Sequence, residues 1–367
     1  MEHNTTCGNE SSRGEAFIKV DDMASANGSN ATCGTDLLFN QPTWWRVCQT
    51  AIIAAVSVSI VLGNLVNLVV LSRVQQMPWA IRCFLLNLSV SDLCVGLIAC
   101  LPAIYPSIVG DWPYGDAFCQ VSGVVHGSSV TISIWCISMV GFERYVAAVR
   151  PYKYHAWVND RRCFTTVALM WPAAIITFLA PNIIAKDFVY YHYDHAQKIC
   201  GLQWEQPAYC IITGLYIPVL SGVSLLFTSI SIHRVLNRST TGFRTSRSRE
   251  TRPSVNRRTL RILVATAVTY FVCWGPYVCL VMVASIWCDV RTPQWVQFMA
   301  LWVANSNSAV NVFIYSATNK HFRYSARCLL QQITCRDVDK LSSLSLMADS
   351  RALNEISKDY RTSPDKN

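Results

Sequence analysis

Seven long stretches with almost no charged residues dominate the chain. They cover residues 51–71, 84–110, 121–142, 163–184, 209–232, 262–287 and 295–317. Each exceeds the roughly 20 residues that an α-helix needs to cross the hydrocarbon core of a bilayer. Only 14% of the residues are charged, whereas a soluble domain would carry about 25%. The pattern predicts an all-α membrane protein in which residues 47–317 form a bundle of seven transmembrane helices.

The distribution of charge predicts which side of the membrane each segment faces. Residues 1–46 carry six acidic and three basic residues, and they contain four Asn-x-Ser/Thr sequons, at Asn4, Asn9, Asn27 and Asn30. Such sequons are N-glycosylation acceptors in extracellular segments. The loop at about 234–261 instead carries nine Arg and a single acidic residue, Glu250, as cytoplasmic loops do. We therefore expect a multi-pass protein of the plasma membrane with a glycosylated extracellular N-terminal tail.

The net charge of +9 follows from this orientation, and it does not indicate a nucleic-acid partner. The Arg-rich loop has the composition of a basic nucleic-acid arm, but it is tethered between two spans. Beyond the last span, residues 318–334 predict a short amphipathic eighth helix. Residues 335–367 are rich in Ser and Asp with little periodicity, which predicts a disordered cytoplasmic tail.

Asp92 stands in the middle of the second stretch, with no Lys or Arg nearby in the sequence. A lone carboxylate inside a membrane must pair, bind a cation or take up a proton. Two interpretations follow. In one, Asp92 helps to hold a cation with waters; in the other, it is protonated and serves as a structural hydrogen-bonding group.

The last span supplies polar groups that could meet Asp92. At about 100° per residue, four of them share one face: Asn307, Ser308, Asn311 and Tyr315. Asn305 lies off this stripe. Lipid offers no hydrogen-bond partners, so the stripe must face the bundle interior. We therefore predict a chamber of oxygen ligands formed by Asp92, Ser133 of the third span, Asn307 and Asn311. Oxygen ligands suit a hard cation, and we expect sodium.

The third span carries a second polar stripe. His126, Ser133 and Arg144 project within about 20° of one another, and about 27 Å of helix separates His126 from Arg144. Adjacent residues of a helix point in different directions, so Arg144 should be free of Glu143 at least part of the time and able to change partners. The alternative is an interfacial Arg whose side chain extends to water.

Several motifs, in a fixed order, make residues 47–330 resemble the rhodopsin-like (class A) G-protein-coupled receptors. They are GNLVN with Asn64, LSVSDL with Asp92, Trp112 followed by Cys119, ERY at 143–145, Trp171 with Pro181, Cys200, Pro218, CWGP at 273–276, NVFIY at 311–315 and NKHFR at 319–323. Each motif alone is a weak signal, but the ordered set on successive spans is specific.

The resemblance implies roles for individual residues. Cys119 and Cys200 would form a disulfide between the third span and the second extracellular loop. Residues that rearrange when a G protein couples would be Glu143, Arg144, Tyr145, Tyr270, Pro276 and Tyr315. The ligand pocket would be lined by loop residues near Cys200 and by His126, Val130, Trp274, Tyr277 and Leu301. For each pocket residue, plain helix packing is the alternative.

Departures from the family pattern refine these expectations. His126 occupies the place where amine receptors carry an aspartate, so the ligand should not be a simple biogenic amine. Val312 replaces the proline of the Asn-Pro-x-x-Tyr motif, a departure shared with a small set of orphan receptors that signal without ligand. Asn256 stands where an acidic residue restrains Arg144 in other receptors. We therefore expect appreciable basal activity.

Together these features predict a receptor that transmits an extracellular signal to heterotrimeric G proteins by a ligand-biased shift between two packings. Expected partners are an extracellular ligand, a G protein, arrestin, receptor kinases and membrane lipid. No cofactor is expected, apart from a sodium ion as an allosteric ligand. Cys328 and Cys335 would be palmitoylated, with free thiols as the alternative. No motif predicts an enzyme. The alternative function is a non-signalling, receptor-like scaffold for another receptor.

Overall fold

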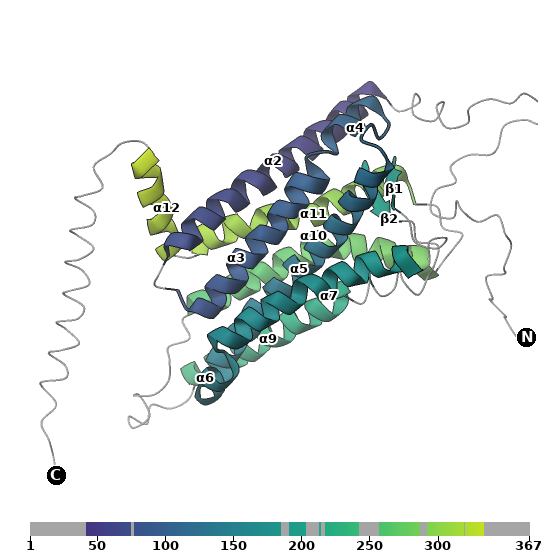
Figure 1. Ribbon diagram of the computed structural model, residues 1–367. Helices are drawn as coiled ribbons and strands as arrows, with labels where there is room; N and C mark the ends of the chain where they lie inside the picture. Colours follow the sequence, from purple (N-terminus) through teal and green to yellow (C-terminus); the bar gives the residue numbers. More distant parts are fainter. Residues whose placement is uncertain are drawn as a thin grey trace, which may run out of the picture.

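The computed structural model describes residues 42–74, 77–184, 191–202, 213, 217–241, 257–286, 292–318 and 320–333. These residues form a helical bundle with one small hairpin (Figure 1). The elements are α2 (Thr43–Arg73), α3 (Trp79–Cys94), η1 (Val95–Cys100), α4 (Ile104–Val109), α5 (Asp116–Val149), η2 (Pro151–Lys153), α6 (Tyr154–Trp157), α7 (Asp160–Ile184), β1 (Tyr191–Asp194), β2 (Ile199–Leu202), α9 (Ile217–Thr241), α10 (Arg257–Ile286), α11 (Gln294–Thr318) and α12 (Lys320–Ile333).

Six helical segments among the described residues are long and apolar enough to cross a membrane. They are α2, the continuous segment from α3 to α4, α5, α7, α9 and α10. The last span predicted from the sequence, α11, is not among the six, because residues such as Asn305, Asn307 and Asn311 lower its mean hydropathy. It nevertheless packs along α10 and α2, which closes the bundle. The all-α membrane fold is confirmed.

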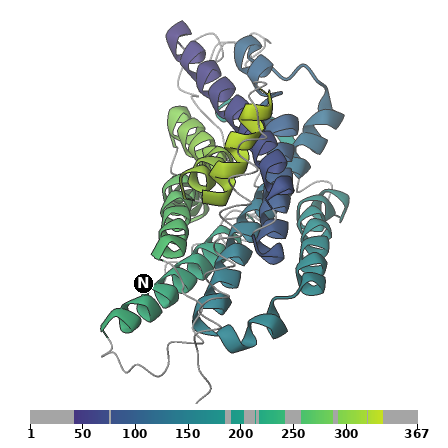
Figure 2. The same cartoon turned by 90° about the vertical axis from the view of Figure 1, so that its left-hand side faces the viewer.

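The two ends of the bundle carry different elements. The β1–β2 hairpin and α4 lie at one end, while α6 and α12 lie at the other (Figure 1). Figure 2 looks onto the end that carries α12, the helix that covers most of the segment predicted to be an amphipathic eighth helix. The long helices therefore connect the hairpin end with the end that carries α6 and α12.

The central helix is α5, which contacts α3, α7, α9 and the hairpin. Small residues permit close approach of other elements to such a helix. A Cβ added at Gly123 would lie 2.0 Å from a ring carbon of Tyr191 in β1, and one at Gly127 would lie 2.5 Å from the Phe178 ring of α7. The two glycines lie one turn apart on the same face of α5, so they allow the hairpin and α7 to approach that face side by side.

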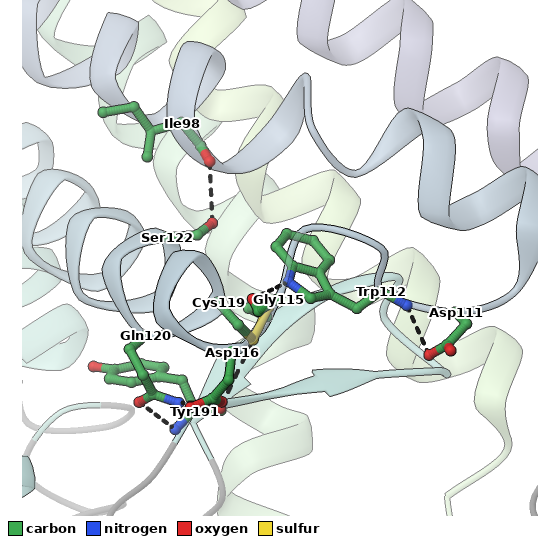
Figure 3. The surroundings of a disulfide bond; sticks show 10 residues. Ile98, Asp111, Trp112, Gly115, Asp116, Cys119, Gln120, Ser122 and Tyr191 are labelled. Atoms are coloured by element: carbon green, nitrogen blue, oxygen red, sulfur yellow. Dashed lines mark hydrogen bonds between the residues drawn. A yellow bond between two sulfur atoms is a disulfide. The ribbon is translucent and has the colours of Figure 1, made fainter.

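A wide turn interrupts the second span. The segment Val95–Cys100 is a π-helix, and the Leu101 N–H donates to the carbonyl of Gly96, five residues back. The hydroxyl of Ser122 in α5 donates to the carbonyl of Ile98 at 3.0 Å (Figure 3). A side chain of the neighbouring helix thus satisfies a carbonyl of the wide turn.

The hairpin is fixed to α5 by covalent and polar contacts. Cys119 and Cys200 form the disulfide that the sequence resemblance implied. Next to it, the Gln120 side chain donates to the carbonyl of Tyr191 at 2.6 Å and accepts from the Tyr191 N–H at 3.1 Å (Figure 3). These contacts hold both strands against the end of α5.

The fit of Gly123 against Tyr191 gives a first prediction. Gly123→Ala should lower the thermal unfolding midpoint of the purified protein, because overpacking costs about 1–3 kcal/mol. Gly275→Ala is the matched control, since an added Cβ there meets nothing within 4 Å. It should cost less stability than Gly123→Ala, because the added Cβ displaces no neighbour. Equal midpoints for the two variants would contradict the tight fit.

Candidate functional site

The carboxylate of Asp92 lies fully buried at the centre of the bundle, with 0% of the residue exposed. The Ser308 hydroxyl donates to Oδ1 at 2.7 Å, and the Asn311 amide donates to Oδ2 at 3.2 Å. Both donors belong to α11, so the carboxylate joins α3 to the last span. No Lys or Arg of the described residues forms an ion pair with it.

Several buried side-chain oxygens of α5 and α2 have no partner among the described residues. Ser133 lies close enough to interact with the Asp92 carboxylate, but its buried hydroxyl has no hydrogen bond of normal geometry. Asn64, which donates to the carbonyl of Ser308 at 3.0 Å, and Asn67 each bury a side-chain oxygen that has no partner within the described chain. Asn307 is buried next to Ser308, with no hydrogen bond to Asp92 found. The interior thus contains side-chain oxygen atoms that have no hydrogen-bond partner among the described residues.

His126 and Asn305 form a second polar contact nearer the hairpin. The Nε2 atom of His126 lies 3.0 Å from Oδ1 of Asn305, a bond that ties α5 to α11. The Asn305 amide nitrogen is buried and has no partner among the described residues. The polar stripe on α11 is therefore wider than predicted. Asn305, which was expected to lie off the stripe, contacts α5 at His126.

The remaining predicted pocket residues lie close together on neighbouring helices. The rings of Trp274 and Tyr277 meet edge to face with centroids 6.0 Å apart, and Val130 packs against the same apolar core. Leu301 is buried in a cluster with Ala99 and Ile199, against which Tyr277 packs. Ile199 belongs to the hairpin, so part of the predicted pocket is covered by the chain itself.

The hairpin also reaches α11 through a hydrogen bond. The indole N–H of Trp302 donates to the carbonyl of Gln197 at 2.9 Å. Asp194 shapes the turn, because its Oδ1 accepts from the N–H groups of Ala196 and Gln197 at 2.7 and 3.0 Å. The turn of the hairpin is therefore held over the end of α11.

Near the opposite end, Glu143 and Arg144 pair with each other. Two guanidinium nitrogens of Arg144, Nε and the terminal NH2, donate to the two carboxylate oxygens of Glu143. Neighbouring positions on a helix point apart, but these two long side chains curve back to meet. Arg144 is therefore paired in this conformation, and Glu143 supplies the partner.

A third residue, Tyr154 of α6, completes this cluster. Its hydroxyl donates to Oε1 of Glu143 at 2.7 Å. Burial and the adjacent carboxylate of Glu143 raise the pKa of Tyr154 well above its ordinary value, so the hydroxyl stays a proton donor at any physiological pH. Tyr154 thus fixes the carboxylate that holds Arg144.

The other predicted switch residues occupy two helix contacts. The ring of Tyr145 lies 5.5 Å from that of Phe227 in α9. The hydroxyl of Tyr270 in α10 donates to the carbonyl of Pro218 in α9 at 2.6 Å, which supplies the partner that this hydroxyl needs. Pro276 lies inside α10. Contacts of α9 with α5 and α10 are therefore made by residues predicted to rearrange.

Some predicted residues fall where the structure gives no description. Tyr315 lies within α11, but its side chain is outside the described set. Cys328 lies in α12 and is not part of a disulfide. Five residues lie outside the described part of the chain altogether: Asn4, Asn9, Asn27, Asn30 and Cys335. The same holds for Asn256 and for most of the Arg-rich loop.

The fold and the site define a membrane-embedded receptor bundle with a buried polar centre. Residues 63–315 match the model of the family described as 7 transmembrane receptor (rhodopsin family). The chain therefore belongs to the rhodopsin family of seven-transmembrane receptors, in which α11 is the seventh span.

Relatives in this family are receptors for chemically different signals. The chain is 27% identical to Tachykinin-like peptides receptor 86C of Drosophila melanogaster, a match that covers 82% of this chain and 62% of that receptor. It is 25% identical to Neuropeptide FF receptor 2 of Mus musculus, covering 71% and 67%. It is 25% identical to Histamine H2 receptor of Homo sapiens, covering 79% and 80%. The chain thus spans less than two thirds of the length of the tachykinin-like peptides receptors.

The geometry at Asp92 gives a second prediction. Asp92→Ala should unfold at a lower temperature than Asp92→Asn, because Ala leaves the Ser308 hydroxyl and the Asn311 amide without an acceptor. Each buried group left unpaired costs about 1–3 kcal/mol, whereas the amide oxygen of Asn can still accept. Thermal unfolding of both purified variants, in potassium buffer without sodium, measures the difference. An Asp92→Ala protein at least as stable as Asp92→Asn would show that these donors find other partners.

Proposed function

We propose that this protein is a receptor that binds an extracellular ligand near the hairpin and signals to a heterotrimeric G protein near Arg144. One observation carries the proposal: Glu143 and Tyr154 hold the Arg144 guanidinium at the end of α5 opposite the hairpin. A buried carboxylate bound to a partly exposed Arg forms a contact that a cytoplasmic partner can replace. In the proposed inactive packing, Arg144 is held by this contact. Binding of the G protein would release Arg144 from it.

Polar contacts that tie α11 and α9 to other helices connect the two ends in this proposal. The His126–Asn305 bond lies nearest the hairpin, the contacts of Asp92 with α11 lie in the middle, and the Tyr270–Pro218 bond joins α9 to α10. A ligand that binds one arrangement of these contacts more tightly shifts the population toward it. In this proposal, the signal passes when these hydrogen bonds break and others form, and not by gradual bending of the helices.

A panel of second-messenger assays tests this function directly. Cells that express the wild-type chain should show basal output in at least one G-protein pathway. Arg144→Ala should lower that output at equal surface expression, because the proposed coupling contact is lost. If no pathway responds to expression of the wild-type chain or of a chimeric G protein, the signalling proposal fails and a receptor-like scaffold becomes the better hypothesis.

Orientation in the membrane follows from the same proposal. The protein would lie in the plasma membrane. The hairpin end and the four sequons would face the exterior. The Arg-rich loop, α6 and α12 would face the cytoplasm. Arrestin and receptor kinases would share the cytoplasmic face with the G protein. The thiol of Cys328 in α12 would be a palmitoylation site beside the membrane surface.

The centre around Asp92 fits a sodium ion. Hard cations prefer oxygen ligands, and this centre offers a buried carboxylate together with the uncommitted hydroxyl of Ser133. Asn307 and Asn311 would contribute amide oxygen after small rotations. A cation would supply the positive charge that no side chain provides, and by bridging α3, α5 and α11 it would favour the packing described here.

Sodium binding gives a third prediction. Sodium chloride should raise the unfolding midpoint of the purified wild-type protein above that in potassium chloride of equal ionic strength. A ligand at ten times its Kd stabilises the folded state by about 1.4 kcal/mol. Asp92→Asn should abolish this difference, because it removes the charge that attracts the cation. If the wild-type protein shows no difference between the two salts, a protonated Asp92 is the better interpretation.

The Tyr154 contact gives a fourth prediction. Tyr154→Phe should raise basal signalling severalfold at equal surface expression, because it frees the carboxylate that restrains Arg144. A hydrogen bond contributes about 1 kcal/mol, which corresponds to about fivefold in the ratio of the two packings.

Tyr152→Phe is the matched control for this experiment. Tyr152 lies two residues away, is 73% exposed, and its hydroxyl accepts from Arg150 and makes no contact with Glu143. Its removal should not raise basal output, because it frees no carboxylate that restrains Arg144. A Tyr154→Phe output at or below that of Tyr152→Phe would overturn the restraining role.

A further inference from the structure

Two buried N–H groups on neighbouring helices have no hydrogen-bond acceptor among the described residues. One is the indole Nε1 of Trp274 in α10, and the other is the amide Nδ2 of Asn305 in α11. Trp274 is 7% exposed and Asn305 is 2% exposed. A buried donor without an acceptor destabilises a protein, and lipid cannot supply one. The two groups therefore point to an acceptor that comes from outside the chain.

A direct contact between the two helices shows that both groups belong to one junction. The Sγ atom of Cys273 in α10 lies 3.8 Å from the Oγ atom of Ser306 in α11. Cys273 directly precedes Trp274, and Ser306 directly follows Asn305. The two helices also pack along each other. A single bound molecule could therefore contact both helices at this level of the bundle.

His126 of α5 determines which group Asn305 offers to such a molecule. Its Nε2 atom lies 3.0 Å from Oδ1 of Asn305. An amide oxygen can only accept, so Nε2 must carry the hydrogen of this bond. The bond occupies the oxygen of Asn305 and fixes its amide group. Asn305 therefore keeps its N–H bonds, and no acceptor, for a ligand.

Side chains that point into the bundle beside these donors keep accessible surface. His126, Val130 and Tyr277 are each only partly buried, although His126 meets buried Asn305. Val130 packs against two separate core clusters, and Tyr277 does the same. Inward-facing side chains with accessible surface line a space between helices. The helices of this half of the bundle therefore do not close completely around the unpaired donors.

The chemistry of these side chains specifies the kind of ligand. None of them is an Asp, Glu, Lys or Arg. A carboxylate would accept from the donors but would be buried without a cation, which is costly. An ammonium would place its own N–H groups against N–H donors. A carbonyl oxygen has two lone pairs and no charge, so it fits both donors, and the edge-to-face rings of Trp274 and Tyr277 suit an apolar body.

We propose that Asn305 and Trp274 bind the carbonyl oxygen of an uncharged extracellular ligand that carries an apolar body. This inference rests on the proposed receptor function, and it names the chemical class of the ligand. His126 is a positioning residue in this site, because it holds the Asn305 amide in the orientation that presents N–H. The ligand would join α10 to α11 and supply the acceptor that the chain lacks.

Thermal unfolding of the purified full-length protein tests the site with acetophenone as the probe. The matched probe is 1-phenylethylammonium chloride, which has the same skeleton but carries a charged donor in place of the carbonyl oxygen. The salt concentration is kept constant. At about 10 mM, ten times a Kd of about 1 mM, acetophenone should raise the unfolding midpoint by about 2–4 °C more than the ammonium probe.

Variants locate the effect, each compared with its own midpoint without probe. Trp274→Phe removes the indole N–H and should lose at least half of the acetophenone effect. The double variant His126→Phe with Asn305→Leu should lose as much, and it should still fold because both partners of a buried bond become apolar. Trp171→Phe is the matched control, since that indole already donates to Asn87 at 2.9 Å. It should keep the full effect.

Two results would overturn the site. One is an equal change in the midpoint of the wild-type protein with both probes, including no change with either. The other is an acetophenone effect of wild-type size in Trp274→Phe or in the double variant. The measurement needs no G protein, so its failure leaves the signalling proposal intact. Arg144→Ala should retain the acetophenone effect even where it abolishes signalling.

Discussion

The exclusion of water from the membrane interior is the constraint on which this structure depends. Lipid cannot satisfy a buried polar group, so polar side chains inside the bundle depend on partners within the protein. Asp92 meets α11, and the indole of Trp171 in α7 donates to the Asn87 side chain of α3 at 2.9 Å. Polar residues that would destabilise an isolated span therefore determine which helices lie side by side, and they limit the number of packings available to the bundle.

The same constraint explains which parts of the structure the sequence predicts. Long segments with few charged residues identify the spans. A rotation of about 100° per residue along the helix places Asn311 on the face that meets Asp92. This periodicity gives the direction of a side chain from its own helix axis but not the distance to a neighbouring helix. The bond of His126 to Asn305 was therefore missed. Its signal was available, since both residues are polar and lie toward the same end of their spans.

Contacts that begin in loops were the least predictable. No periodic pattern marks Tyr154, because it lies in a four-residue helix after a turn, and its contact with Glu143 depends on the path of that turn. The hairpin is similar: a disulfide at Cys200 follows from family resemblance, but the burial of Lys198 depends on a backbone conformation that few residues adopt. In both cases a short connection, and not a helical or strand period, sets the position of the side chain.

The π-helix at Val95–Cys100 has a consequence for comparing this receptor with others. A wide turn holds an additional residue, so side chains beyond it are rotated by about 100° from where a regular helix would carry them. A receptor without the wide turn would therefore need one residue fewer between the Asp92 position and the hairpin end of this span. An alignment without a gap would pair residues that face different neighbours. Positions such as Ala99 and Cys100 should be compared only after the turn has been counted.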